Sequence, residues 1–284
     1  MDETKLNLPS FDKLPGAIAV DLDGTLLNSQ AQISERTYIA VIACTERDIP
    51  VVIATSRPAR TLSRAIGEKL IEKCSLIFMN GAFAVAAPPL NGFVRETIEP
   101  SLAKEIIDLT ISIEPNIRIT IEVEGYWFST NIPRDPGELW RVNAATPDMQ
   151  LPLDVALADK PAKIAVGGLN RDLSHVVSAI SRRFYTEVSL VLAEGNTFLN
   201  ITSSKATKPH ALKQLLDSRQ ISLADVVAFG DDIPDLDMLA ACGISIALSN
   251  SVPELKAVCK YQTASNDDDG VAIVLERILG VMNR

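Results

Sequence analysis

The feature that most constrains this chain is a rhythm of short apolar runs that stop at polar residues and alternate with helix-like stretches. The first run, 17–20, stops abruptly at Asp21 and Asp23, and a second run, 51–54, stops at Thr55. Short apolar runs of this kind are typical of buried parallel strands. Strand, helix, strand, helix, strand in this order predicts an α/β core, a doubly wound, Rossmann-like parallel sheet with helices on both faces.

The rhythm changes in the middle of the chain, where alternating and β-branched stretches such as NIRITIEV replace it. It returns after residue 202 with a helical stretch and the strand-like run DVVAFG. We therefore predict a core domain from residues 1–85 and 203–284, with an inserted α+β domain from 86–202. Helices at about 101–113 and 173–184 are expected to cover one face of an antiparallel sheet in the insert. A proline-rich part of the insert has weak periodicity, so no element is predicted there.

Composition excludes several classes of protein. The chain has 284 residues, of which 47% are hydrophobic, which is enough for two cores of unequal size. A net charge of −9 without a basic cluster argues against a nucleic-acid partner. No apolar run is long enough for a membrane span, and the first residues lack a secretory pattern, so a cytoplasmic location is expected. The four cysteines have no paired spacing and predict neither a disulfide framework nor a zinc site.

Polar side chains follow four of the expected strands at the point where each ends. Because ligands of open α/β sheets bind beyond the carboxyl ends of the strands, these side chains are candidates for a shared site. Carboxylates gathered in a low-dielectric cleft repel one another unless a cation lies between them. Oxygen ligands select a hard cation, and we predict Mg²⁺. The candidates are Asp21 and Asp23, Thr55 with Ser56 and Arg57, Asn80, and Asp231, Asp232 and Asp235.

The same positions carry a resemblance to a known family. The string DLDGTLL, which begins at Asp21, resembles the first signature of the haloacid dehalogenase (HAD) superfamily of phosphohydrolases. Thr55, Lys208 and the stretch GDDIPD resemble its second, third and fourth signatures, in the family's order. The long insert is similar to the large cap of the Cof-type subfamily, and the strings ALSNSVPELK and SNDDDGVA resemble that subfamily's C-terminal pattern. The resemblance covers nearly the whole chain after about Gly16, and four signatures in register are highly specific.

The resemblance implies a role for each acidic residue. Asp21 is the implied nucleophile, which forms an aspartyl-phosphate and so divides one difficult displacement into two easier ones. Asp23 is implied to protonate the leaving oxygen and then to activate the hydrolytic water. Mg²⁺ is implied to bind the side chain of Asp21, the backbone carbonyl of Asp23 and the side chain of Asp231. Asp235 is implied to bind the ion directly or from one shell further out.

A phosphate site is expected beside these carboxylates. Thr55 and Lys208 are the implied hydroxyl and ammonium that hold the phosphate. Gly24 permits a tight turn whose backbone amides approach it without a side chain in the way. Ser56 belongs to the same predicted phosphate-binding group, although it stands where a glycine is common in the family. Pro234 stands where an asparagine is common, and both departures bear on substrate placement more than on chemistry.

Each of these residues also has an ordinary structural interpretation. Asp21 and Asp23 are compatible with a solvated turn, and Asp232 is expected only to cap the helix that follows. Arg57 is interpreted as a solvated residue at a helix start. Lys208 also begins a helix, an unfavourable end for a cation, which favours a functional purpose.

From these patterns we predict a Mg²⁺-dependent phosphatase that acts on a small phosphorylated metabolite, such as a sugar phosphate. Two alternatives stay open. A phosphomutase of the same superfamily would form an isomer in place of inorganic phosphate. A phosphometabolite-binding module without turnover would have no use for a nucleophile. The substrate and the oligomeric state are not predicted.

Overall fold

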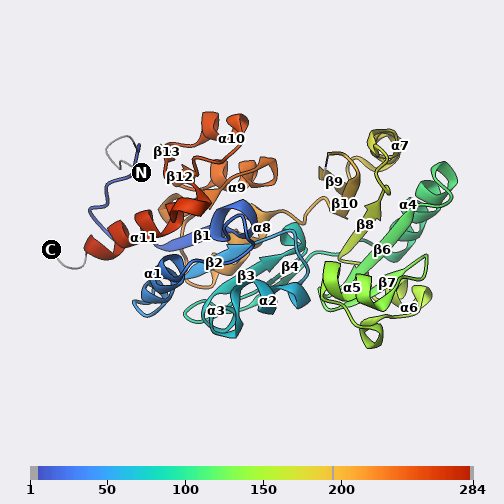
Figure 1. Ribbon diagram of the computed structural model, residues 1–284, viewed down its shortest axis with the longest axis horizontal. Coiled ribbons are helices and arrows are strands. Elements are labelled where there is room, and N and C mark those ends of the chain that lie inside the picture. The colour runs from blue at the N-terminus through green and yellow to red at the C-terminus, as the bar shows by residue number, and fades with distance from the viewer. Residues whose placement is uncertain (1–5, 194, 282–284) are drawn as a thin grey trace.

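The computed structural model describes residues 6–193 and 195–281, whose strands form two sheets in two lobes (Figure 1). We call the larger sheet with its helices the core lobe, and the smaller sheet with its helices the insert lobe. The larger sheet has the order β13-β12-β11-β1-β2-β3-β4-β5. Its strands are β1 (Ala17–Asp21), β2 (Val51–Ala54), β3 (Ser75–Phe78), β4 (Phe83–Val85), β5 (Phe93–Arg95), β11 (Val226–Gly230), β12 (Ile244–Ala247) and β13 (Tyr261–Gln262).

Six strands of the larger sheet are parallel, as predicted, and β4 and β5 add an antiparallel edge that the sequence analysis did not predict. Alternation along β1 divides its side chains between two apolar layers. Ile18 and Val20 pack toward one set of helices, and Ala17 and Ala19 pack toward the other. The first set is α1 (Glu35–Thr45), α2 (Leu62–Ile66), α3 (Glu68–Lys73) and α11 (Gly270–Gly280), and the second is α8 (Lys208–Asp217), α9 (Leu236–Ala241) and α10 (Pro253–Val258). The doubly wound core is thereby confirmed.

The insert lobe is an antiparallel sheet of order β7-β6-β8-β10-β9. Both helices predicted there are present and pack on one face of this sheet. Two further helices lie in the stretch for which no element was predicted. The elements are α4 (Pro100–Ile113), β6 (Arg118–Val123), β7 (Trp127–Thr130), α5 (Pro136–Asn143), α6 (Leu153–Ala158), β8 (Lys163–Gly167), α7 (Ser174–Phe184), β9 (Val188–Ala193) and β10 (Phe198–Ser203).

The two faces of the smaller sheet differ in character because side chains alternate along each strand. Along β6, Ile119 and Ile121 join the apolar layer beneath α4 and α7. Arg118, Thr120 and Glu122 lie on the opposite face, which is the face turned toward the core lobe. The insert lobe therefore presents a polar surface where the two lobes meet.

The chain passes between the lobes after β5 and again after β10 (Figure 1). Because β5 still pairs with β4 in the larger sheet, we propose that the insert begins after Arg95, later than the expected boundary at residue 86. A buried ion pair between Arg60 of the core lobe and Glu122 of the insert lobe joins the two lobes. Among the described residues, no helix is both long and apolar enough to cross a lipid bilayer.

Candidate active site

Three acidic side chains meet at the carboxyl edge of the larger sheet. Asp21 is the last residue of β1, and Asp231 follows β11, which pairs with β1 in parallel. Asp235 lies in the short turn before α9. One carboxylate oxygen from each of the three lies within 4.8 Å of the others. The structure thus brings together side chains more than two hundred positions apart in sequence, because neighbouring parallel strands end at the same edge.

Lys208 lies inside this cluster. It is the first residue of α8, and the side chain of the preceding residue, Thr207, caps that helix. Its Nζ atom is 2.5 Å from Asp21 Oδ1 and 2.6 Å from Asp235 Oδ1. Burial alone would lower the pKa of Lys208, but the carboxylates of Asp21 and Asp235 outweigh burial and raise it above its ordinary value. The ammonium group therefore stays charged.

Asp235 is held mainly by its own chain segment. Its second oxygen, Oδ2, accepts hydrogen bonds from the backbone N–H groups of Asp231 and Asp232, at 3.1 and 3.3 Å. The side chain of Asp232 accepts from the N–H of Ile233, which confirms the expected capping role. Because both oxygens of Asp235 are already engaged, this residue is better placed to orient Lys208 and Asp231 than to act alone.

The cluster carries more negative charge than its own cation balances. Three carboxylates and one ammonium leave two charges uncompensated. Burial, and then the nearby Asp235, raises the pKa of Asp21 well above its ordinary range, and burial raises the pKa of Asp231 to about 6. Proton uptake is the response expected of buried carboxylates that lack a counter-ion. An oxygen donor set with two uncompensated charges fits a hard divalent cation.

The turn after β1 shapes this site at close quarters. Gly24 has a φ of +79°, and a Cβ atom added there would lie 2.3 Å from Asp231 Oδ2. Thr25 Oγ1 donates to Asp231 Oδ1 at 2.7 Å, and Asn250 Nδ2 donates to the carbonyl of Gly24 at 2.8 Å. A glycine is therefore required twice over, by the backbone conformation and by the space that Asp231 occupies.

Asp23 lies apart from the three-carboxylate cluster and binds a residue whose importance the sequence interpretation underrated. Arg57 Nε donates to Asp23 Oδ2 at 2.9 Å, and the same guanidinium also contacts Asp23 Oδ1. Arg57 is thus half-buried and paired, and its interpretation as a solvated residue at a helix start is wrong. A bidentate guanidinium fixes the plane of a carboxylate as well as its position.

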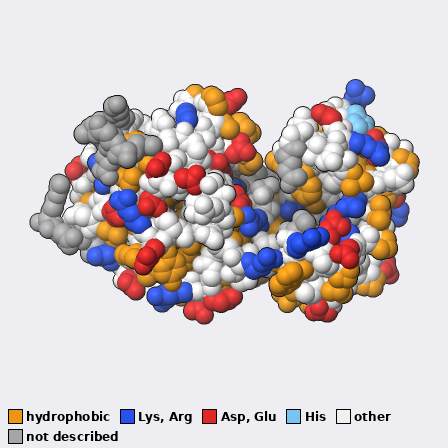
Figure 2. Space-filling model, viewed as in Figure 1, with side chains coloured by type: hydrophobic (Ala, Val, Ile, Leu, Met, Phe, Trp, Pro, Cys, Tyr) orange, Lys and Arg blue, Asp and Glu red, His pale blue; other side chains and the backbone are white. Residues whose placement is uncertain are grey.

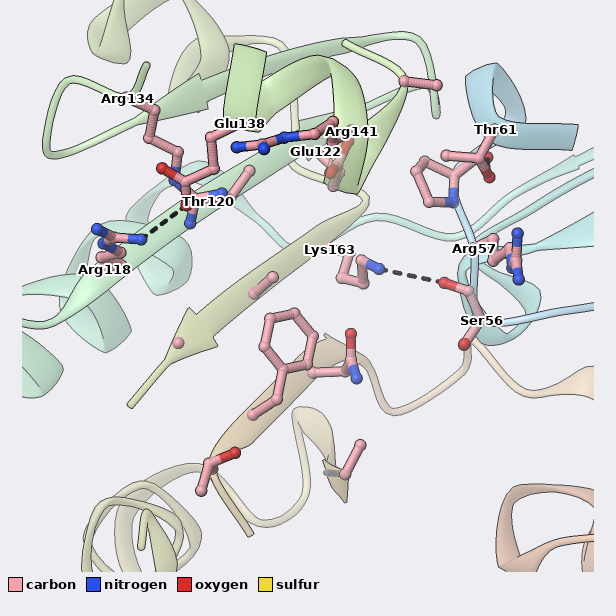
Figure 3. Close-up of a pocket in the computed structure, with 18 of the residues that line it drawn as sticks. Ser56, Arg57, Thr61, Arg118, Thr120, Glu122, Arg134, Glu138, Arg141 and Lys163 are labelled. Carbon is pink, nitrogen blue, oxygen red and sulfur yellow. Dashed lines mark hydrogen bonds and ion pairs between the residues drawn. The ribbon is translucent and has the colours of Figure 1, made fainter. Parts of the chain in front are cut away.

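The segment after β2 completes the core side of the site. Thr55 is buried, and its Oγ1 accepts from the backbone N–H of Arg57 at 3.1 Å, which leaves the hydroxyl hydrogen free to donate. The side chain of Ser56 is exposed, and its carbonyl accepts from Lys163 Nζ of the insert lobe at 3.1 Å (Figure 3). Pro234 is exposed in the turn that also contains Asp235.

A cavity of about 780 Å³ lies between the lobes and begins at Ser56 and Arg57. Its other walls come from Arg64 and Ala65 of α2, from the polar face of the smaller sheet and from α5 (Figure 3). Lys and Arg side chains gather where the two lobes meet (Figure 2). The sequence analysis named no cavity residue from the insert. The alternation in RITIEV, residues 118–123, is the sequence signal from which Arg118, Thr120 and Glu122 could have been assigned to one face of the sheet.

The fold and the site together define a class of hydrolase. Residues 18–275 match the model of the haloacid dehalogenase-like hydrolase family, and the chain belongs to this family. It is similar to phosphatase YwpJ of Bacillus subtilis, at 26% identity in an alignment 295 positions long that covers 92% of this chain and 99% of that protein. It is also similar to the B. subtilis 5-amino-6-(5-phospho-D-ribitylamino)uracil phosphatase YitU, at 24% identity over 272 residues that cover 92% and 97%.

The architecture of both lobes recurs in a solved structure. A haloacid dehalogenase-like hydrolase from Bacteroides thetaiotaomicron superimposes with a TM-score of 0.77 at 24% identity, covering 93% of this chain and 99% of that one. Family and relatives together support phosphatase chemistry for this chain.

Proposed function

We propose that this protein is a Mg²⁺-dependent phosphatase that hydrolyses a small phosphorylated metabolite through an aspartyl-phosphate on Asp21. The observation that carries the proposal is the convergence of Asp21, Asp231 and Asp235 within 4.8 Å around a buried Lys208. The two relatives described above, YwpJ and YitU, are phosphatases by name, which supports the same chemistry.

Asp21 has one oxygen oriented and one free. Oδ1 accepts from Lys208, whereas Oδ2 has no hydrogen-bond partner among the described residues. In the first step a bond forms between an Asp21 oxygen and phosphorus while the bond from phosphorus to the ester oxygen breaks. Lys208 holds the carboxylate in position and neutralises charge on the phosphoryl oxygens.

Asp23 handles the protons in both steps. It gives a proton to the departing ester oxygen, and it then takes one from the water that attacks phosphorus and releases Asp21. Arg57 fixes the Asp23 carboxylate between these events through its two contacts. The free hydroxyl hydrogen of Thr55 and the backbone amides after Gly24 are the proposed remaining donors to the phosphate, at the position that Ser56 borders.

When bound, Mg²⁺ would neutralise the two uncompensated negative charges and charge on the phosphoryl group. The residues proposed to hold it are Asp21 and Asp231 through their side chains and Asp23 through its backbone carbonyl. Asp235 would support the site indirectly, because its oxygens are shared with Lys208 and with backbone N–H groups.

The test is phosphate release from p-nitrophenyl phosphate with Mg²⁺, with a chelator, and with the Asp21→Asn variant. We expect release that requires Mg²⁺ and falls by about a thousandfold or more in Asp21→Asn, the scale seen when a nucleophile is removed. Asp232→Asn is the matched control, because the Asp232 side chain caps a turn and asparagine caps equally well. A wild-type rate no higher than that of Asp21→Asn would overturn the proposal. Product analysis with a sugar phosphate separates phosphate release from the isomer that a phosphomutase would form.

A further inference from the structure

The cavity between the lobes is strongly basic although the chain as a whole is acidic. Two carboxylates, Glu122 and Glu138, are among the described residues that line it, and the net charge of the chain is −9. A local field opposite in sign to that of the whole molecule attracts anions to one place. The cations of the lining are Arg57, Arg64, Arg118, Arg134, Arg141 and Lys163.

Several of these charges already have partners. Arg57 binds Asp23, Arg118 NH1 donates to Glu138 Oε1 at 2.8 Å, and Glu122 is paired with Arg60. Arg64 NH1 donates to the carbonyl of Trp140 at 2.9 Å. Arg134 and Arg141 have no ion-pair or hydrogen-bond partner within the described parts of the chain, 6–193 and 195–281.

The position of Arg134 is electrostatically costly. Its side chain is half-buried, and burial lowers its pKa. The cation of Arg118 lowers the pKa further, whereas Glu138 and Glu122 raise it. A partly desolvated guanidinium beside a second one is unfavourable unless an anion joins them. The arrangement is therefore suited to a ligand that brings negative charge.

Arg118 and Arg134 lie at the end of the cavity that is farther from the core lobe. In the register of the smaller sheet, Glu122 pairs with Lys163, which reaches the carbonyl of Ser56, and Arg118 pairs with Gly167. Arg118 is thus four residues further along β6, or about 13 Å at about 3.3 Å per residue. Arg118 and Arg134 lie together at that end, with Lys163 between them and Ser56 (Figure 3). One phosphate held beside Asp21 is too small to contact both ends.

Between its two ends, the cavity is lined by uncharged polar side chains of the smaller sheet. Asn200 lines the cavity, is only 7% exposed, and its Oδ1 has no hydrogen-bond partner among the described residues. A buried amide oxygen without a partner is uncommon in folded proteins. Thr120 lies on the same face. These groups suit the hydroxyls of a leaving group that spans the cavity.

We infer that the substrate is a phosphomonoester whose leaving group carries hydroxyls and a second anionic group, either a carboxylate or a phosphate. Arg134 binds this second anion beside Arg118, and Arg141, which lines the same cavity, is the second arginine assigned to it. The inference rests on the proposed phosphatase function and narrows its substrate class. The scissile phosphate lies at Asp21, and the second anion lies at the far end of the insert lobe.

A matched set of six-carbon esters tests this inference. Sorbitol 6-phosphate has one anionic group, 6-phosphogluconate adds a terminal carboxylate, and sorbitol 1,6-bisphosphate adds a terminal phosphate. For wild type with Mg²⁺ we expect kcat/KM for at least one doubly anionic ester to exceed that for sorbitol 6-phosphate about tenfold or more, the scale of a charge-assisted hydrogen bond. The preferred ester identifies the second anion. Equal kcat/KM values for all three would overturn the inference.

Variants then assign the preference to residues. In Arg134→Gln and Arg141→Gln the ratio of doubly to singly anionic substrate should fall toward one. Arg182→Gln is the matched control, because Arg182 is an exposed arginine on α7, which packs on the opposite face of the smaller sheet. A ratio unchanged in both cavity variants, or lowered equally by Arg182→Gln, would contradict the assignment.

A binding measurement separates this inference from the proposed function. Calorimetric titration of the Asp21→Asn variant with the three esters in Mg²⁺ measures selectivity without turnover. A binding preference for the doubly anionic esters, with no hydrolysis by wild type, would contradict the proposed phosphatase function and support the inferred ligand class. Hydrolysis of p-nitrophenyl phosphate with no preference among the three esters, in binding or in turnover, would contradict the inferred ligand class and support the proposed phosphatase function.

Discussion

At the scale of single residues, Asp231 owes its position to the turn that follows β1. Thr25 donates to one of its oxygens, and the missing side chain of Gly24 leaves space for the other. These contacts place Asp231 beside Asp21, so the first and fourth signatures of the chain act as one structure. The proposed metal site, because it is built in this way, should be sensitive to a single added methyl group.

Gly24→Ala tests that sensitivity. The added Cβ would lie 2.3 Å from Asp231 Oδ2, so the carboxylate must move or the turn must open. We expect Mg²⁺ affinity to fall about tenfold or more, the scale seen when the geometry around a metal is disturbed, as measured by calorimetric titration. Gly67→Ala is the control, since Gly67 has a similar φ of +76° but no atom within 4 Å of an added Cβ. Equal Mg²⁺ affinity in the two variants would contradict the account.

Protons should compete with the cation at the same oxygens. Burial raises the pKa of Asp231 to about 6 and also raises that of Asp21, so both carboxyls take up protons as the pH falls. Metal binding requires the ionised forms, and affinity must therefore decrease toward acid pH. Below about pH 6 we expect the apparent Mg²⁺ affinity to fall about tenfold per pH unit for each proton displaced. Calorimetric Mg²⁺ titrations at several pH values between about pH 5 and 8 check this prediction. An Mg²⁺ affinity that does not change over this pH range would contradict the assignment of these ligands.

At the scale of elements, strand β6 serves two surfaces through its alternation. Its apolar residues anchor α4 and α7, and its polar residues face the cavity and the core lobe. Glu122 is one of the residues at which the lobes meet, because Arg60 NH2 donates to its Oε1 at 2.8 Å and both side chains are buried. The ion pair couples the position of the sheet to the position of the segment after β2.

Removing one charge of that pair should be costly. In Glu122→Gln the guanidinium of Arg60 stays buried without its carboxylate, and we expect the free energy of unfolding to fall by about 3 kcal/mol or more. Urea denaturation measures the change. Glu105→Gln, which breaks the exposed pair between Arg183 and Glu105, is the control and should cost less than about 1 kcal/mol. If the two variants lose the same stability, the pair does not hold the lobes together.

Elements with a strong local signal were predictable from the sequence. β1, β2 and β11 are apolar runs that end in polar residues, and α4 and α7 carry a helical repeat, so each was predicted close to its observed bounds. β4 and β5 were missed because their short segments have little pattern, and their pairing depends on β3 beside them. α5 was missed because its proline-rich surroundings mask its periodicity.

At the scale of the whole molecule, the convergence of distant segments was predictable but the cavity was not. The order of parallel strands implies that Asp21 and Asp231 lie at the same carboxyl edge of the larger sheet, and the structure places them there. The contact between Arg57 and Asp23 depends on how two loops of the core lobe lie beside each other, and the orientation of Arg134 depends on how the segments of the insert lobe pack. No local pattern carries that information. The side of the site that we propose to select the substrate therefore emerges only from the assembled molecule.

The most direct test of the central claim is mass spectrometry of the Asp23→Asn variant, quenched during reaction with p-nitrophenyl phosphate and Mg²⁺. The p-nitrophenolate group departs without a proton from Asp23, whereas the attack of water on the phosphoenzyme still needs that base. We predict that a phosphoryl group accumulates on the peptide that contains Asp21, and that it is absent when the chelator is added first. Release of inorganic phosphate with no phosphoryl group on this peptide at any quench time would contradict the account.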